Sequence, residues 1–164
     1  MKELIVEKAA EVRAPAAAIW EQMMAVKEWP SWQPFITKAR IASDYENLSC
    51  GSRIRFSLMA GGPASLPLTA AVTEFDRPRR LAWTGGLHGW FYAEHSFDFE
   101  DQGGGVTRVV SRERFTGHLL PLVLLIVPAA DLEELHVKWV SAIKERMEGK
   151  PAGAPAAAPA APSH

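Results

Sequence analysis

Residues 91–115 read FYAEHSFDFEDQGGGVTRVVSRERF, and this stretch decides the fold because two alternating segments flank a glycine turn. In the first segment apolar side chains recur at nearly every second position, and in the second the arginines at 108, 112 and 114 alternate with an inward set that includes Val109 and Phe115. This alternation is the pattern of a β-strand with one face covered. The three glycines at 103–105 are a strong turn signal. Segments 91–100 and 106–115 are therefore predicted to pair as an antiparallel hairpin.

The alternation also places two ionisable side chains, His95 and Glu113, on the apolar face of this hairpin. The complete inward set is Phe91, Ala93, His95, Phe97 and Phe99 on the first strand, and Thr107, Val109, Ser111, Glu113 and Phe115 on the second. Pairing Phe99 with Val109 would set a register in which His95 lies opposite Glu113. A lone buried charge is costly, so two interpretations are open. The two residues form a structural ion pair, or His95, held by Glu113, is a polar anchor directed at the carbonyl or hydroxyl of a ligand.

More strands precede the hairpin. Residues 4–13 form a β-compatible opening segment, and strand-like runs follow at 36–43, 53–59, 66–75 and 79–84. Their inward side chains are Ile54, Phe56, Leu58, Leu81 and Trp83. Short connections between successive strands favour an antiparallel meander.

Helical patterns occur at two places. Pro15 precedes a short predicted helix at 16–24, and the prolines within 28–35 break regular structure around a second short helical turn. Residues 131–148, DLEELHVKWVSAIKERME, have apolar positions at helical spacing and a charged opposite face. Pro128 either begins this long helix or kinks a longer one that starts near Pro121. A curved antiparallel sheet covered by a long C-terminal helix is predicted, which is an α+β fold.

Length and charge exclude several classes of protein. The 164 residues fit one domain, predicted at 1–149, and the Pro/Ala-rich residues 150–164 are predicted to form a disordered tail. With 18 basic and 19 acidic side chains the formal net charge is −1, so nucleic acid and anionic membranes are not expected as main partners. One cysteine, Cys50, and no signal-peptide pattern indicate a cytoplasmic protein.

The apolar run 119–127 is about half of the ~20 residues that span a bilayer, so no stable membrane insertion is expected. It is too apolar for an ordinary loop. A cavity lid, an interfacial membrane patch and a homodimer contact are the three interpretations.

Familiar catalytic motifs are missing from the sequence. It contains no phosphate-binding glycine loop, no nucleophile elbow and no His-Glu-x-x-His. Glu133 and His136 have Glu-x-x-His spacing, but di-iron sites need a second copy, so His136 is interpreted as a boundary residue that could reach a pocket from the helix side. No metal or cofactor is predicted.

Five stretches carry a resemblance to a known superfamily: APAAAIW (14–20), WQPFI (32–36), RLAWTG (80–85), EHSF (94–97) and ERFTG (113–117). In this order and spacing, from about residue 3 to 148, they resemble the SRPBCC superfamily, which includes START lipid-transfer domains, pollen-allergen-like proteins and polyketide cyclases. The resemblance implies a helix-grip fold, in which a seven-stranded antiparallel sheet wraps around a long C-terminal helix and encloses an apolar cavity. It implies a cavity mouth at 60–66, at 85–91 and at the start of the last helix. The superfamily shares no catalytic constellation, so no catalytic residue is carried over.

The leading hypothesis is binding of a hydrophobic small molecule, such as a lipid, polyketide or aromatic compound, in that cavity. The predicted ligand-binding residues are Trp32, Phe35, Phe56, Leu58, Leu68, Trp83, Trp90, His95, Phe97, Glu113, Phe115, Val123, Ile126 and His136. The alternative is a polyketide cyclase or aromatase in which His95 is the general base and Glu113 raises the pKa of His95. A third hypothesis is an interaction module that uses 119–127 and the tail.

Overall fold

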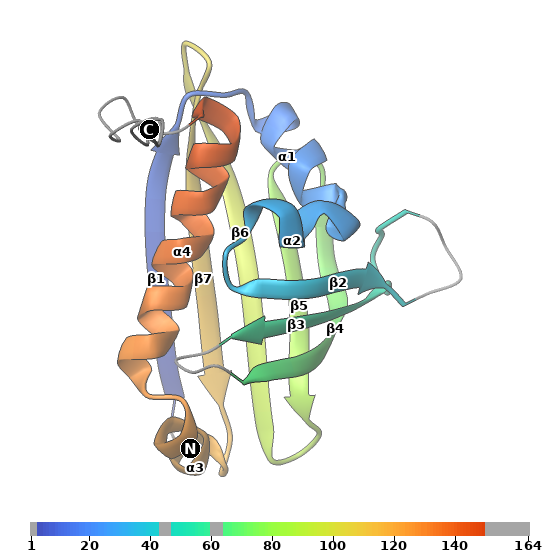
Figure 1. The fold of residues 1–164 in the computed structure, drawn as a ribbon, viewed down its shortest axis with the longest axis vertical. Helices are drawn as coiled ribbons and strands as arrows, with labels where there is room; N and C mark the ends of the chain where they lie inside the picture. The colour runs from blue at the N-terminus through green and yellow to red at the C-terminus, as the bar shows by residue number, and fades with distance from the viewer. Residues whose placement is uncertain (1–2, 43–46, 60–63, 150–164) are drawn as a thin grey trace, which may run out of the picture.

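The computed structural model describes residues 3–42, 47–59 and 64–149, and its centre is a seven-stranded antiparallel sheet (Figure 1). The strands are β1 (Glu3–Val12), β2 (Ile36–Ile41), β3 (Arg53–Met59), β4 (Ser65–Asp76), β5 (Arg80–Leu87), β6 (Phe91–Gly103) and β7 (Val106–Thr116). Their order across the sheet is β1-β7-β6-β5-β4-β3-β2, so the first strand pairs with β7 and extends the meander of β2 to β7 at that edge. The predicted tail at 150–164, the end of the predicted strand at 43 and positions 60–63 of the predicted cavity mouth lie outside the described residues.

The helices interrupt this order at two points. After β1 come α1 (Ala16–Met24), a 3-10 turn (Val26–Glu28) and the one-turn α2 (Trp29–Trp32), and after β7 come α3 (Leu120–Ile126) and α4 (Ala129–Glu148). Pro128 is the N-cap residue of α4 with extended backbone angles, so it begins the long helix and does not kink a longer one. The apolar run 119–127 forms the separate helix α3.

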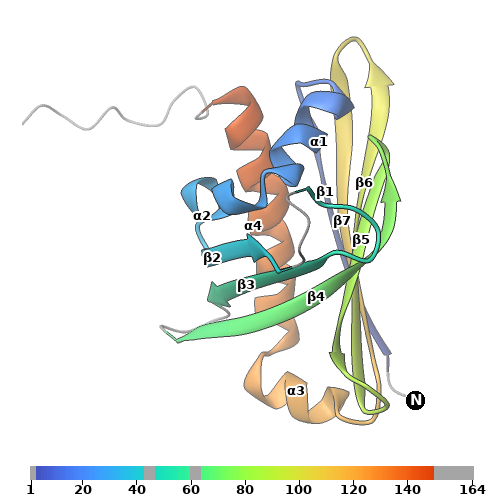
Figure 2. The same cartoon turned by 90° about the vertical axis from the view of Figure 1, so that its right-hand side faces the viewer.

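The sheet curves around α4. Figure 2 shows β2, β3 and much of β4 turning away from the plane of β5–β7, so that they pass beside α4. On the other side α4 packs along β1 and β7, and an ion pair between Lys8 and Glu133 at 3.0 Å ties β1 to α4. This is the predicted helix-grip α+β fold, and it is confirmed.

The aromatic core lies between the sheet and the C-terminal half of α4. Trp139 of α4 is at its centre, with ring centroids 5.1 Å from Phe97, 5.4 Å from Phe35 and 5.5 Å from Trp29. Of the inward sets predicted from alternation, Ile54, Leu81 and Val109 are fully buried, whereas Leu58, Phe91 and Ala93 are half-buried. A second, smaller cluster of Val6, Phe115, Leu120 and Leu132 packs below the first, toward α3.

In the described part of the chain, no helix has the length and apolar character needed to cross a membrane.

Candidate functional site

An apolar cavity of about 190 Å³, partly open to solvent at Leu66 and Leu68, lies between the sheet, α3 and the N-terminal half of α4. The residues that β3, β4 and β5 supply to its wall are Phe56, Leu58, Leu66, Leu68, Thr69, Ala70 and Trp83. Phe91, Ala93, Glu113 and Phe115 come from β6 and β7, and Val123, Val127, Leu132 and Leu135 come from α3, α4 and the junction between them. From the segment 119–127, Val123 and Val127 line the cavity, whereas Leu122, Leu125 and Ile126 are exposed.

Small residues of β5 and β6 form part of this wall. Gly85 pairs with Ala93 across β5 and β6, and both lie at the cavity. The neighbouring Gly86 has φ +136°, and a Cβ on it would stand 2.3 Å from the Phe91 carbonyl oxygen. Only glycine fits there. The strand pair therefore approaches closely without filling the space in front of it.

Glu113 supplies the only ionisable side chain among the described residues of the cavity wall. Its side chain is 20% exposed, and its Oε2 lies 3.0 Å from Nε2 of the buried His136. Thr69 contributes a hydroxyl-bearing residue to the wall, which is otherwise apolar. The cavity can therefore surround an apolar molecule and present one carboxylate to it.

Behind Glu113 a chain of hydrogen bonds runs into the core. Ser111 Oγ lies 2.8 Å from His136 Nδ1 and 2.9 Å from His95 Nε2. His95 and His136 are 5% and 1% exposed, so the chain is sealed from water. The residues that the structure describes contain no group of three His, Cys, Asp or Glu side chains placed to hold a metal ion.

Three predictions about the histidines are wrong. His95 lies opposite Glu113 in the predicted register, but its side chain is bonded to Ser111, and His136 holds Glu113. Burial, with a contribution from nearby His136, lowers the pKa of His95 well below its usual value, which is opposite to the predicted rise. His136 is not a boundary residue, because α4 turns it directly into the core.

Half of the predicted ligand-binding residues lie at the cavity: Phe56, Leu58, Leu68, Trp83, Glu113, Phe115 and Val123. Five others, Trp32, Phe35, Phe97, His95 and His136, lie outside the cavity wall in the core around Trp139, where aromatic rings fill the space. Trp90 and Ile126 are 61% and 75% exposed, because the β5–β6 turn and the outer side of α3 direct them away from the cavity.

Sequence reasoning missed several wall residues. The helical spacing places Leu132 and Leu135 on the apolar face of the long helix without marking them as wall residues, and no pattern marks Ala70. Ser111 was placed on the inward face, but no pattern marked it as the link between two histidines. That link needs the rotation of α4 relative to β7, which no local pattern contains.

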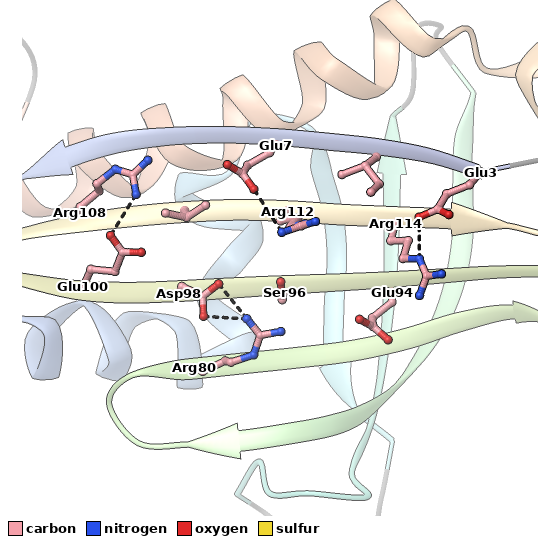
Figure 3. Close-up of a pocket in the computed structure, with 12 residues that line it drawn as sticks. Glu3, Glu7, Arg80, Glu94, Ser96, Asp98, Glu100, Arg108, Arg112 and Arg114 are labelled. Carbon is pink, nitrogen blue, oxygen red and sulfur yellow. Dashed lines mark hydrogen bonds and ion pairs between the residues drawn. The ribbon is translucent and has the colours of Figure 1, made fainter.

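A larger depression of about 540 Å³ lies on the opposite face of the sheet, but its chemistry is different (Figure 3). Its arginines face carboxylates: Arg80 with Asp98 at 2.7 Å, Arg108 with Glu100 at 3.0 Å, Arg114 with Glu3 at 2.9 Å and Arg112 with Glu7 at 3.7 Å. These ion pairs form a charged outer surface that offers little to an apolar molecule. We therefore take the smaller cavity as the candidate site.

Solved structures with this fold include enzymes and a protein named only for its superfamily. The family model described as polyketide cyclase/dehydrase and lipid transport matches residues 3–148. A START superfamily protein from Mycobacterium smegmatis superimposes with a TM-score of 0.68 at 20% identity, covering 88% of this chain and 97% of its own. The Zhui aromatase/cyclase from Streptomyces sp. R1128 gives 0.74 at 18% identity, covering 90% and 94%. Truncated norcoclaurine synthase from Thalictrum flavum gives 0.67 at 15% identity, covering 92% and 96%.

No curated protein matches the sequence. The structural similarities, at these identities, establish the shared fold, and the family match covers all the described strands and helices. The chain therefore belongs to the polyketide cyclase/dehydrase and lipid transport family, within the SRPBCC superfamily that its sequence resembles.

Proposed function

We propose that this protein binds a small hydrophobic molecule in the cavity between α3, α4 and the sheet. The observation that carries the proposal is an almost wholly apolar space, partly open to solvent, beside a core filled by aromatic side chains. An unfilled apolar space costs stability, so its retention favours a use for it. The family, whose description includes lipid transport, supports the same conclusion.

The volume limits the ligand. About 190 Å³ exceeds the ~150 Å³ of an apolar cavity that holds benzene, and it is below the ~300 Å³ at which drug-sized pockets begin. A substituted single ring or a short branched chain fits this space.

Binding can be tested with single-ring probes. Toluene, p-xylene and p-cresol should each raise the melting temperature and shift backbone amide resonances of cavity residues. A probe at ten times its Kd stabilises the fold by about 1.4 kcal/mol. If none of the three shifts the melting temperature or the amide spectrum, the cavity does not bind ligands and the proposal is wrong.

A second candidate function is catalysis of the cyclase or aromatase type, and the observation that favours it is the Glu113 carboxylate at the cavity wall. In this version Glu113, and not the buried His95, takes a proton from an acidic carbon between two carbonyls and leaves an enolate. The similarity of fold to an aromatase/cyclase supports it.

Deuterium exchange separates the two functions. The central methylene of ethyl acetoacetate should exchange faster with the protein than without it, and E113Q should abolish the acceleration. E134Q, on the exposed face of α4, is the matched control and should exchange like the parent protein. Binding without any acceleration would overturn the catalytic version and leave the binding proposal in place.

A further inference from the structure

The hydrogen-bond chain that ends at the cavity has a fixed direction at its last step. It runs from His95 through Ser111 to His136 and then to Glu113, with contacts of 2.9, 2.8 and 3.0 Å. Each contact holds one hydrogen, so fixing the donor at one contact restricts the others. The carboxylate at the cavity is the natural starting point.

An ionised Glu113 can only accept hydrogen bonds, so His136 Nε2–H must donate to Oε2. In a neutral His136 the bare Nδ1 then accepts from the Ser111 hydroxyl, which in turn accepts from His95 Nε2–H. In a charged His136 the Nδ1–H donates to Ser111, and Ser111 donates to His95. Both arrangements satisfy every contact, and in both His136 Nε2–H donates to Glu113.

This direction determines what Glu113 offers to a ligand. One carboxylate oxygen is occupied by His136, and no other hydrogen bond of the Glu113 side chain occurs within the described residues. The second oxygen is therefore an acceptor without a protein donor at an apolar wall. A ligand carbonyl or ether oxygen would face it lone pair against lone pair, whereas a ligand hydroxyl or amine would pair with it.

We infer that the cavity selects hydrophobic molecules that carry a hydrogen-bond donor, such as a phenol, an alcohol or an amine, and that His136 and Ser111 are positioning residues that aim the Glu113 carboxylate at this donor. The inference rests on the proposed binding function and specifies its ligand class. The donor must stand at one end of the ligand, because the rest of the wall is apolar apart from Thr69.

Three para-substituted toluenes of similar shape test the ligand class. p-Cresol carries a donor, p-xylene carries no polar group and p-tolualdehyde carries only an acceptor. Dissociation constants from amide-shift titrations should be ~10–100-fold lower for p-cresol than for p-xylene, and p-tolualdehyde should bind most weakly. This order is informative because p-xylene is the most apolar of the three and a purely apolar cavity would favour it.

Variants of Glu113 supply the control. E113L should remove the preference and bind p-xylene more tightly than p-cresol. E113Q, whose amide also has a donor, should improve p-tolualdehyde binding relative to the parent protein. S111A tests the positioning role. In this variant the ratio of p-cresol affinity to p-xylene affinity should fall several-fold, while the affinity for p-xylene stays unchanged.

The outcomes separate the two proposals. If p-xylene binds the parent protein as tightly as p-cresol, or if E113L keeps the p-cresol preference, the inference about the donor is overturned while the binding function stands. If S111A leaves the ratio unchanged, the positioning role is wrong. If none of the three probes binds, the proposed function fails, and the inference fails with it.

Discussion

At the scale of single residues, Ser111 is the side chain on which the buried polar network depends. Its hydroxyl is the shared partner of His95 Nε2 and His136 Nδ1, and it is fully buried on β7. S111A would leave both nitrogens in the core without this partner. We expect a loss of about 1–3 kcal/mol in the free energy of unfolding, measured by urea denaturation.

Ser96 provides the matched control for this prediction. It is also a buried serine, on the neighbouring β6, but its side chain faces the charged outer surface and makes no hydrogen bond within the described residues. S96A should change the free energy of unfolding by less than ~0.5 kcal/mol. Equal losses in the two variants would show that the Ser111 hydroxyl does not support the histidines.

Glu148, the last residue of α4, makes stability depend on pH in the acid range. Hydrogen bonds from Lys144 Nζ to Oε1 at 3.3 Å and from the Arg13 backbone N–H at 2.8 Å lower the pKa of Glu148 from 4.5 to about 2. Because the folded pKa lies below the unfolded one, the stabilisation is complete above pH 4.5 and is lost as the pH falls toward 2.

E148Q should therefore lower the free energy of unfolding by about 1 kcal/mol at pH 7, and the difference from the parent protein should shrink below pH 4. Urea denaturation at several pH values measures it. E134Q, which breaks an exposed pair with Lys138 on the same helix, should cost less at pH 7. A constant difference from pH 7 to pH 2.5 would contradict this account of Glu148.

At the scale of elements, the two halves of α4 pack against different surroundings. The C-terminal half carries Trp139, which is 4% exposed and contacts rings from β6 and from the segment around α2. The N-terminal half carries Leu135, which borders the cavity. Truncating a side chain lowers the free energy of unfolding most where the side chain is surrounded by other groups, because all of those contacts are then lost.

W139A should lower the free energy of unfolding by about 3–5 kcal/mol. L135A, the comparison on the same helix, should cost no more than ~2 kcal/mol because one side of Leu135 already faces empty space. Chemical denaturation of the two variants measures both values. A larger loss for L135A than for W139A would show that the cavity end is the better-packed end.

Sequence periodicity predicted these elements well where one face is covered, and less well at their ends. The strand expected at 79–84 extends to Leu87, because Gly85 and Gly86 continue the ladder opposite Ala93 and Tyr92 instead of turning. The two glycines predict a turn at 85–86, whereas in the structure they remain in the strand and line the cavity. The helix at 120–126 was hidden because an all-apolar run has no period to detect.

At the scale of the whole molecule, the fold could be predicted but the position of the hollow could not. Alternation on β6 and β7 gave the correct inward face and register. Which part of the interface stays open depends on how far Trp29, Trp83 and Trp139 reach across it, and this is set by side-chain conformations. The predicted site residues were therefore drawn from both the filled and the open parts of one apolar layer.

The claim that the open part serves binding can be tested by filling it. Ala93 lies at the cavity on β6, opposite both Gly85 and Phe115, so the larger side chain of A93L would enter the empty space and need not displace the core. We expect the free energy of unfolding to change by less than ~1 kcal/mol, since new apolar contacts offset small packing strain. Affinity for p-cresol and p-xylene should fall at least tenfold, as measured by amide-shift titration. A9L, the same change at an exposed position of β1, should bind both probes like the parent protein, whereas undiminished binding by A93L would place their site elsewhere on the molecule.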